Sequence, residues 1–335
     1  MPQNFIDTAR ASANLRTRAI DLVGRRILMT NLMGSEEAKD FTLPANCGGF
    51  GRIHHFRREQ SPPFPQNSLP IDPAAKFLGL GKPQVLQVQV FQNAVCTWRC
   101  WYCFVDFNLL SGNPKFSEFK SVGEILNLYL AESNRPSIID LSGGQPDLVP
   151  EWTLWFLREL LNRGLKDSVY VWGDDNLSND YLWRYLKPNE LEELVAYRGY
   201  GRVGCFKGFD SESFSFNTSA SPELFDQQFS LMRRLVEAGF DVYGYATFTS
   251  PNERHIEKKM ADFVDMLQEK VHPNFPLRTI PLRISVFTPT AARVGPDQRT
   301  AIEIQQIAVA AWTSELERRF DRTTLERDIM DHTLD

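Results

Sequence analysis

The chain has 335 residues, of which 42% are hydrophobic and 12% aromatic, and its formal net charge is −5. This content can bury a large core, so we expect one α/β barrel with an extension, the alternative being two smaller domains. The negative charge argues against a nucleic-acid partner, and no apolar run reaches membrane-spanning length.

Cysteine usage indicates the compartment. The five cysteines are an odd number dominated by one tight group, which does not resemble a disulfide framework. The first residues, Met1–Asn4, lack the basic and apolar stretches of a secretory leader. We therefore expect a cytoplasmic protein in a reducing environment.

Residues 1–83 show no regular alternation of strands and helices. The stretch from Phe5 to Val23 can form one amphipathic helix, whereas Cys47–Gly51 and the proline-rich stretch Ser61–Pro73 predict irregular structure. We expect this segment to be an extension that packs on the barrel and can act as a lid. His54 and His55 lie within it without other metal-ligand residues at suitable spacing, which favours surface or structural roles.

Residues 84–320 alternate between strand-like and helix-like stretches. The predicted strands are 85–91, 138–141, 168–172, 200–206, 242–248 and 282–287, and the predicted helices are 121–131, 150–163, 190–197, 221–239, 252–268 and a last one carrying an apolar stripe from Ile302 to Phe320. Six such pairs predict a partial (β/α)6 TIM-like barrel of parallel strands, with a site at the carboxyl ends of the strands. Residues 321–335 are expected to be a charged C-terminal tail.

Three cysteines follow the first predicted strand at the spacing C-x3-C-x2-C, as Cys96, Cys100 and Cys103. Three thiolates on one loop can hold three corners of a 4Fe-4S cluster and leave the fourth iron without a protein ligand. The alternative is a structural zinc site, which normally closes its tetrahedron with a fourth Cys or a nearby His. Because the next cysteine is Cys205 and the loop contains no His, the ligand count favours the cluster.

This loop, with aromatic Tyr102 directly before its last cysteine, resembles the cluster loop of the radical S-adenosylmethionine (radical SAM) superfamily. The resemblance covers about residues 84–290. It implies a 4Fe-4S cluster whose open iron binds S-adenosylmethionine, and cleavage of that cofactor to a 5'-deoxyadenosyl radical that takes a hydrogen atom from a substrate. It also implies an electron donor such as flavodoxin or ferredoxin.

The turn Gly143-Gly144-Gln145-Pro146 follows the second predicted strand and resembles the glycine-glycine-glutamate-proline turn of that family. Glycine allows a backbone to approach the amino group of the cofactor closely. Gln145 replaces the usual glutamate, and its neutral amide oxygen is a weaker acceptor for an ammonium group than a carboxylate.

Three polar residues, Asp174, Asp175 and Asn176, end the third predicted strand and are similar to the stretch that contacts the ribose and methionine of the cofactor in the family. Short polar side chains at a strand end suit sugar hydroxyls, and they equally suit an Asx turn. Arg283, in the sixth predicted strand, can hold a carboxylate if it faces the lumen.

The fourth predicted strand runs into Cys205-Phe206-Lys207-Gly208 and resembles a segment of glycyl-radical-enzyme activases, in which an acid stands at the position of Cys205. The resemblance implies that Lys207 contacts the cofactor. Cys205 is either a small buried hydrophobe or a thiol that donates a hydrogen atom to a substrate radical.

Two classes of function follow. The first is a radical-generating enzyme that acts on a small molecule, or alternatively on a protein or peptide, including glycyl-radical activation. The second is a non-catalytic iron-sulfur or zinc-binding module. A lid that closes the barrel would favour a small-molecule substrate, and an open cleft would favour a polypeptide.

Overall fold

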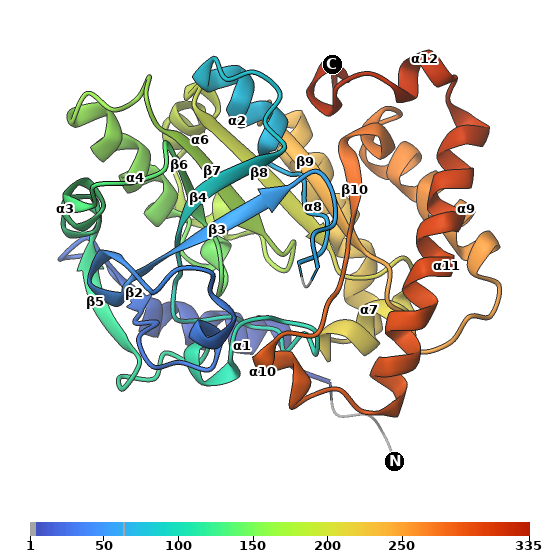
Figure 1. Cartoon of the computed structure of the whole chain (residues 1–335), viewed down its shortest axis with the longest axis horizontal. Helices are drawn as coiled ribbons and strands as arrows, with labels where there is room; N and C mark the ends of the chain where they lie inside the picture. The colour runs from blue at the N-terminus through green and yellow to red at the C-terminus, as the bar shows by residue number, and fades with distance from the viewer. Residues whose placement is uncertain (1–4, 63) are drawn as a thin grey trace.

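The computed structural model describes residues 5–62 and 64–335, and its centre is a curled sheet of seven strands in the order β10-β9-β8-β7-β6-β4-β3 (Figure 1). The strands are β3 (Gly51–Arg57), β4 (Val85–Phe91), β6 (Ile138–Leu141), β7 (Tyr170–Asp175), β8 (Tyr200–Phe206), β9 (Val242–Thr247) and β10 (Thr279–Leu282). Neighbouring strands from β4 to β10 are parallel, and β3 runs antiparallel to β4. The predicted partial barrel of parallel strands is therefore confirmed.

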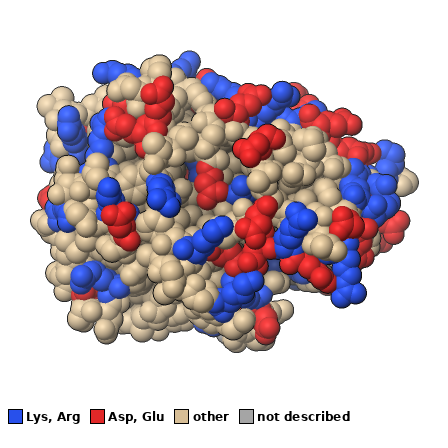
Figure 2. Space-filling view, turned by 90° about the horizontal axis from the view of Figure 1, so that it is seen from above, with Lys and Arg blue, Asp and Glu red and all other residues tan. Residues whose placement is uncertain are grey.

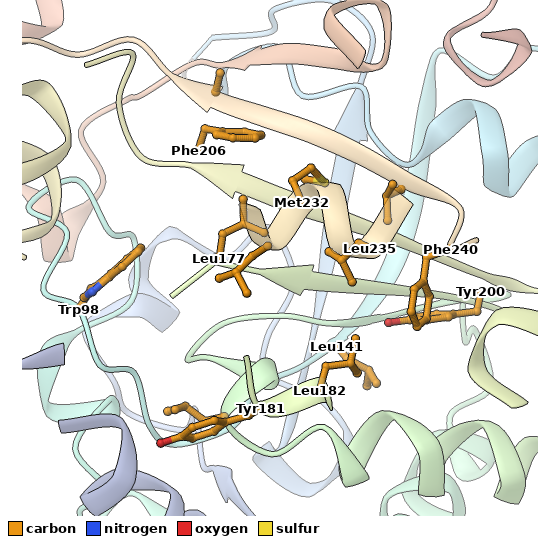
Figure 3. Close-up of a cluster of buried hydrophobic side chains, with 14 of the residues drawn as sticks. Trp98, Leu141, Leu177, Tyr181, Leu182, Tyr200, Phe206, Met232, Leu235 and Phe240 are labelled. Atoms are coloured by element: carbon orange, nitrogen blue, oxygen red, sulfur yellow. The ribbon is translucent and has the colours of Figure 1, made fainter. Parts of the chain in front are cut away.

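Helices cover the convex face of the sheet, and their apolar sides form the main core with it. The helices of the chain are α1 (Thr8–Ala19), α2 (Ile71–Leu78), α3 (Val122–Ala131), α4 (Glu151–Asn162), α5 (Tyr181–Tyr185), α6 (Pro188–Ala196), α7 (Ser211–Thr218), α8 (Phe225–Glu237), α9 (Ile256–Met266), α10 (Thr288–Ala291), α11 (Pro296–Arg319) and α12 (Arg322–Leu325). Figure 3 shows how α8 contributes, because its Met232 and Leu235 lie beside Leu177 under the sheet.

Local capping explains where helices begin. Ser121 and Glu124 form a capping box at the start of α3, with the Ser121 hydroxyl accepting from the Glu124 N–H at 3.2 Å and the Glu124 carboxylate accepting from the Ser121 N–H at 2.7 Å. Each bond satisfies a backbone donor that the helix itself leaves unpaired. The helix predicted over 121–131 is thus present almost unchanged.

The concave face of the sheet encloses the lumen, and alternation along each strand sorts residues between the two faces. In β6, Ile139 and Leu141 belong to the main core, whereas Ile138 faces the lumen with Tyr170 and Trp172 of β7. The amino-end half of the lumen is filled by aromatic side chains and by α2. Polar residues are left for its carboxyl-end half.

The sixth parallel strand, Thr279–Leu282, lies before the predicted range 282–287 and shares only Leu282 with it, so the predicted position was wrong. It ends at Leu282, and the backbone beyond it bonds to a helix instead of to β9. The Gln305 side chain of α11 accepts from the Ile284 N–H at 2.6 Å and donates to the Ile284 carbonyl at 3.2 Å. The segment after Leu282 therefore does not continue the strand, because the Gln305 amide takes the hydrogen bonds of Ile284 that a neighbouring strand would otherwise make.

The extension contains more regular structure than expected. Its strand β3 joins the main sheet, and β2 (Arg26–Thr30) forms a three-stranded antiparallel sheet with β1 (Ile20–Asp21) and β5 (Ser117–Ser121). In β3, the lumen-facing positions are partly polar, so the apolar alternation typical of a strand is weak. The division at residue 83 stays a prediction, and the expectation about Met1–Asn4 lies outside the described residues.

No helix in the described part of the chain is both long and apolar enough to cross a membrane. On the face shown in Figure 2, Lys and Arg are interspersed with Asp and Glu. That face offers no broad basic area of the kind that binds nucleic-acid phosphates.

Core packing under α8 gives a first prediction. Leu235 is completely buried, whereas Leu161 on α4 is 52% exposed. Leu235→Ala removes contacts and leaves a cavity, so we expect it to lower the free energy of unfolding by about 2 to 5 kcal/mol. Leu161→Ala is the matched control and should cost less than about 1 kcal/mol. Urea unfolding of both variants tests this, and equal losses would contradict the packing described here.

Candidate active site

The three cysteines of the C-x3-C-x2-C motif lie on the loop after β4, at the carboxyl end of the parallel strands, and all three are free thiols. Burial, and then the neighbouring thiols of the motif, raise the pKa of Cys96 to about 12 and that of Cys103 to about 11. Burial also raises the pKa of Cys100. The thiols are therefore close enough to influence one another.

Each thiol of the motif has a basic side chain near it. The charges that lower these thiol pKa values are Arg99 for Cys96, Lys207 for Cys100 and Arg293 for Cys103. Basic groups beside thiols favour the thiolate form that binds metals. The surroundings thus suit an anionic metal-thiolate group.

Within residues 5–62 and 64–335, no three His, Cys, Asp or Glu side chains are arranged as a metal-ion site. The donor set of the loop nevertheless fits a 4Fe-4S cluster, because it offers three unpaired thiols from one short segment.

Side chains from distant segments hold the backbone of the cysteine loop. Arg293, in the segment after α10, donates to the carbonyls of Cys103 and Val105 at 2.7 Å each. Asn217 of α7 accepts from the Trp101 indole N–H at 3.0 Å, and its carbonyl accepts from the Trp101 backbone N–H at 3.2 Å. The loop is thereby fixed to both later parts of the barrel.

The glycine turn after β6 packs directly against the segment that leads into the cysteine loop. Gly143 and Gly144 have φ angles of 75° and 61°, in the left-handed region. A Cβ on Gly144 would lie 2.3 Å from the Asn93 carbonyl oxygen and 2.8 Å from that of Val95. Since both are backbone atoms, only glycine allows this approach.

Gln145 is 1% exposed and binds the cysteine loop with its side chain. Its Oε1 accepts from the Thr97 backbone N–H at 2.9 Å, and its Nε2 donates to Ser178 and, at 3.2 Å, to Asp147. The Asn93 side chain brackets the Gln145 backbone, donating to its carbonyl at 2.7 Å and accepting from its N–H at 2.8 Å. The oxygen and the nitrogen of the Gln145 amide, which was expected to bind the cofactor, are therefore both hydrogen-bonded to protein groups. Pro146, the next residue, begins a 3-10 turn.

The three polar residues at the end of β7 have different surroundings. Asp175 forms a buried ion pair with Arg202 and accepts from the Leu177 N–H at 2.7 Å, which is an Asx turn. Asp174 accepts from the Ser142 hydroxyl, and burial raises its pKa. The side-chain oxygen of Asn176 is buried and has no hydrogen-bond partner among the described residues.

Of the remaining predicted residues, Cys205 faces the lumen and Arg283 does not join the site. Cys205 is 7% exposed and packs with Tyr243 and Tyr245, and burial raises its pKa to about 12. Lys207, two residues further, lies near Cys100. Arg283 donates to the Gln306 side chain of α11 at 3.0 Å, because the strand ends before it.

Sequence reasoning missed several lumen residues. Arg52 of β3 is 6% exposed, lies 3.3 Å from the Glu37 carboxylate, and has its guanidinium 4.9 Å from the Phe104 ring. Asp140 of β6 is 3% exposed. His54, for which a surface or structural role was expected, follows Arg52 on the same face, and burial lowers its pKa to about 3. A signal existed for Asp140, since it is the one acid in an otherwise apolar predicted strand.

Gln145→Ala tests whether the glutamine holds the loop. The change leaves the buried Thr97 N–H and Asp147 carboxylate without these partners, so we expect a loss of about 1 to 3 kcal/mol in the free energy of unfolding. Urea unfolding measures it, with exposed Gln60→Ala as the matched control. A cost no larger than that of the control would show that the loop does not depend on Gln145.

No protein-family model matches the chain, and no curated protein matches it. Among solved structures, it is similar to SuiB of Streptococcus suis bound to S-adenosylmethionine, at 19% identity and a TM-score of 0.39, over 55% of this chain and 37% of SuiB. SuiB bound to its precursor peptide SuiA gives the same identity and score, over 36% of SuiB. A spore photoproduct lyase mutant with bound AdoMet and dinucleoside spore photoproduct matches at 9% identity and a TM-score of 0.44, over 68% of this chain and 72% of the lyase. The chain thus spans little more than a third of the length of SuiB.

Proposed function

We propose that the protein is a radical SAM enzyme in which Cys96, Cys100 and Cys103 hold a 4Fe-4S cluster. The observation that carries the proposal is three free, mutually close thiols on one loop at the carboxyl end of a parallel half-barrel. When bound, the cluster would supply the electron that cleaves S-adenosylmethionine to the radical that abstracts a substrate hydrogen atom.

Residues of the chain would prepare this site by positioning and by charge. Arg293 and Gln145 fix the loop backbone from two sides, so the thiols need little reorganisation to bind. Arg99 and Lys207 would offset the negative charge of thiolate ligands. An electron donor such as ferredoxin or flavodoxin completes the proposal, together with a cytoplasmic location.

For S-adenosylmethionine, the proposed contacts are the Gly143–Pro146 turn, Asp174, Asp175, Asn176, Lys207 and Arg283. Lys207 is the best placed, because its charge acts on both Cys100 and Asp174. Gln145, Asp175 and Arg283 would first have to release protein partners.

We further propose a small-molecule substrate, because the open side of the half-barrel is covered at both ends. In the amino-end half, the Tyr245 hydroxyl donates to the Leu69 carbonyl of the extension at 2.8 Å. At the carboxyl end, Asp40 accepts from the Thr288 N–H at 2.7 Å and from its hydroxyl at 2.8 Å. Since Asp40 precedes β3 and Thr288 follows β10, this contact bridges the two edges of the sheet, and a polypeptide would need it to open.

Anaerobic reconstitution tests the proposed cluster. We expect about four irons per chain and a reduced electron paramagnetic resonance signal that changes when S-adenosylmethionine is added, with release of 5'-deoxyadenosine. Cys100→Ala should lose the signal and the cleavage, and Cys47→Ala, outside the loop, is the matched control. Zinc in place of iron, or a signal indifferent to the cofactor, would support a non-catalytic module instead.

Cys205→Ser tests hydrogen-atom donation by this lumen thiol. The substitution keeps the size of the side chain but replaces the weak S–H bond with a stronger O–H bond. If Cys205 quenches a substrate radical, the product formed per S-adenosylmethionine cleaved should fall at least about tenfold, because a step made by one positioned group is removed. An unchanged ratio would leave Cys205 as a packing residue, and Cys47→Ser controls for loss of a thiol elsewhere.

A further inference from the structure

Two buried carboxylates face the carboxyl-end half of the lumen from neighbouring strands. Asp140 of β6 is in register with Trp172 of β7, and Asp174 follows on the same face of β7 two residues later. Burial raises the pKa of Asp140, and the charge of Asp174 raises it further. A positive charge placed beside the two carboxyl groups would therefore favour their charged form.

Polar atoms beside these carboxylates lack partners. In the described part of the chain, neither Asp140 Oδ1 nor the Trp172 indole nitrogen has a hydrogen-bond partner, and both residues are at most 3% exposed. The benzo edge of Trp172 lies against Gly201 of β8, with Cζ3 only 2.9 Å from the position of a Cβ. The indole N–H is on the opposite edge of the ring and so points away from β8. A buried acceptor and a buried donor thus remain unused on one face of the lumen.

The basic residues of the lumen are engaged elsewhere. Arg52 pairs with Glu37 at 3.3 Å, and Arg202 pairs with Asp175. Lys207 lies in the field of the thiols and of Tyr102. Lys207 and Arg52 lower the pKa of Asp174, and Arg52 lowers that of Asp140, but neither base forms an ion pair with these carboxylates. Among residues 5–62 and 64–335, no Lys or Arg forms an ion pair with Asp140 or Asp174. The one hydrogen bond to these two side chains is donated by the Ser142 hydroxyl to Asp174.

We infer that Asp140 and Asp174 bind a cationic nitrogen of the substrate, which is therefore a small molecule carrying an ammonium or guanidinium group. Either group brings several N–H donors and a positive charge to two carboxylates that form no ion pair among the described residues and accept one side-chain hydrogen bond between them, from Ser142. The Trp172 N–H would donate to an acceptor atom beside that nitrogen. The inference deepens the proposed function and rests on it for the identity of this ligand as a substrate.

Binding of small probes to the full-length, cluster-reconstituted protein without S-adenosylmethionine tests the inference. Isothermal titration at pH 7 compares n-butylammonium and n-butylguanidinium with neutral n-butanol. We expect the cations to bind at least about tenfold more tightly than the alcohol, and Asp140→Asn and Asp174→Asn each to remove about tenfold of that affinity, as loss of a charged hydrogen bond does. Asp297→Asn, on the exposed first turn of α11, makes the same change in net charge and should bind like the wild type.

Several outcomes would overturn the inference. Equal binding of cations and alcohol, or equal cation affinity in wild type and both lumen variants, shows that the carboxylates do not select a cation. A larger loss of S-adenosylmethionine affinity than of amine affinity in Asp140→Asn or Asp174→Asn assigns that carboxylate to the cofactor. Circular dichroism verifies folding, and Asp174→Asn carries the test if Asp140→Asn does not fold. Cleavage of S-adenosylmethionine is measured in a separate assay. If the protein selects cations but does not cleave S-adenosylmethionine, only the proposed function is contradicted. If it cleaves S-adenosylmethionine but does not select cations, only this inference is contradicted.

Discussion

The close approach of two backbones determines where the cysteine loop lies. Gly144 packs against the carbonyls of Asn93 and Val95, and this contact brings the turn after β6 within reach of the loop after β4. The contact also explains why Gln145 can bond the Thr97 N–H and why Asn93 can bracket the Gln145 backbone. A side chain at Gly144 would separate the two strand ends, because neither backbone can move without breaking the parallel ladder between β4 and β6. The glycine turn therefore has a structural role in positioning the thiols, independent of any contact with a ligand.

The sequence predicted the barrel well because most of its strands are buried on both faces. Short and largely apolar runs such as Ile138–Leu141 and Val242–Thr247, which are buried at every residue, predict strands when they lie between helix-like stretches. Prediction failed where side chains replace backbone partners or where polar residues face the lumen. Gln305 ends the sixth strand early, and β3 was missed because Arg52 and His54 interrupt its apolar alternation. The cysteine motif was recognisable from its spacing alone. The different surroundings of Asp174 and Asp175 were not predictable, because they depend on which face of β7 each residue occupies.

The lumen has two halves of different chemistry. Tyr170 packs in the amino-end half together with residues of α2. Trp172 belongs to the same cluster and is in register with Asp140. The carboxyl-end half contains buried charges, which are costly to place in a protein interior unless they serve a ligand or pair with one another. Within this half, the basic residues lie toward the thiols and the unpaired carboxylates lie on β6 and β7. An anionic group at the loop and a cationic group over Asp140 and Asp174 would therefore each meet side chains of opposite charge.

The extension is part of this arrangement rather than an addition to it. Through its pairing with β4, β3 places Arg52 opposite Val90, and β4 in turn places Val90 opposite Asp140, so the register of two ladders sets the distance between the guanidinium and the carboxylate. Arg52 lowers the pKa of Asp140 while its own ion pair is with Glu37, another residue of the extension. Asp40, three residues after Glu37, forms the contact with Thr288 that bridges the edges of the sheet. The segment that carries Glu37 and Asp40 thus covers the open side of the half-barrel and also affects the charges inside it. Opening this cover to admit a substrate would therefore disturb the ion pair of Glu37 with Arg52 beside the cysteine loop.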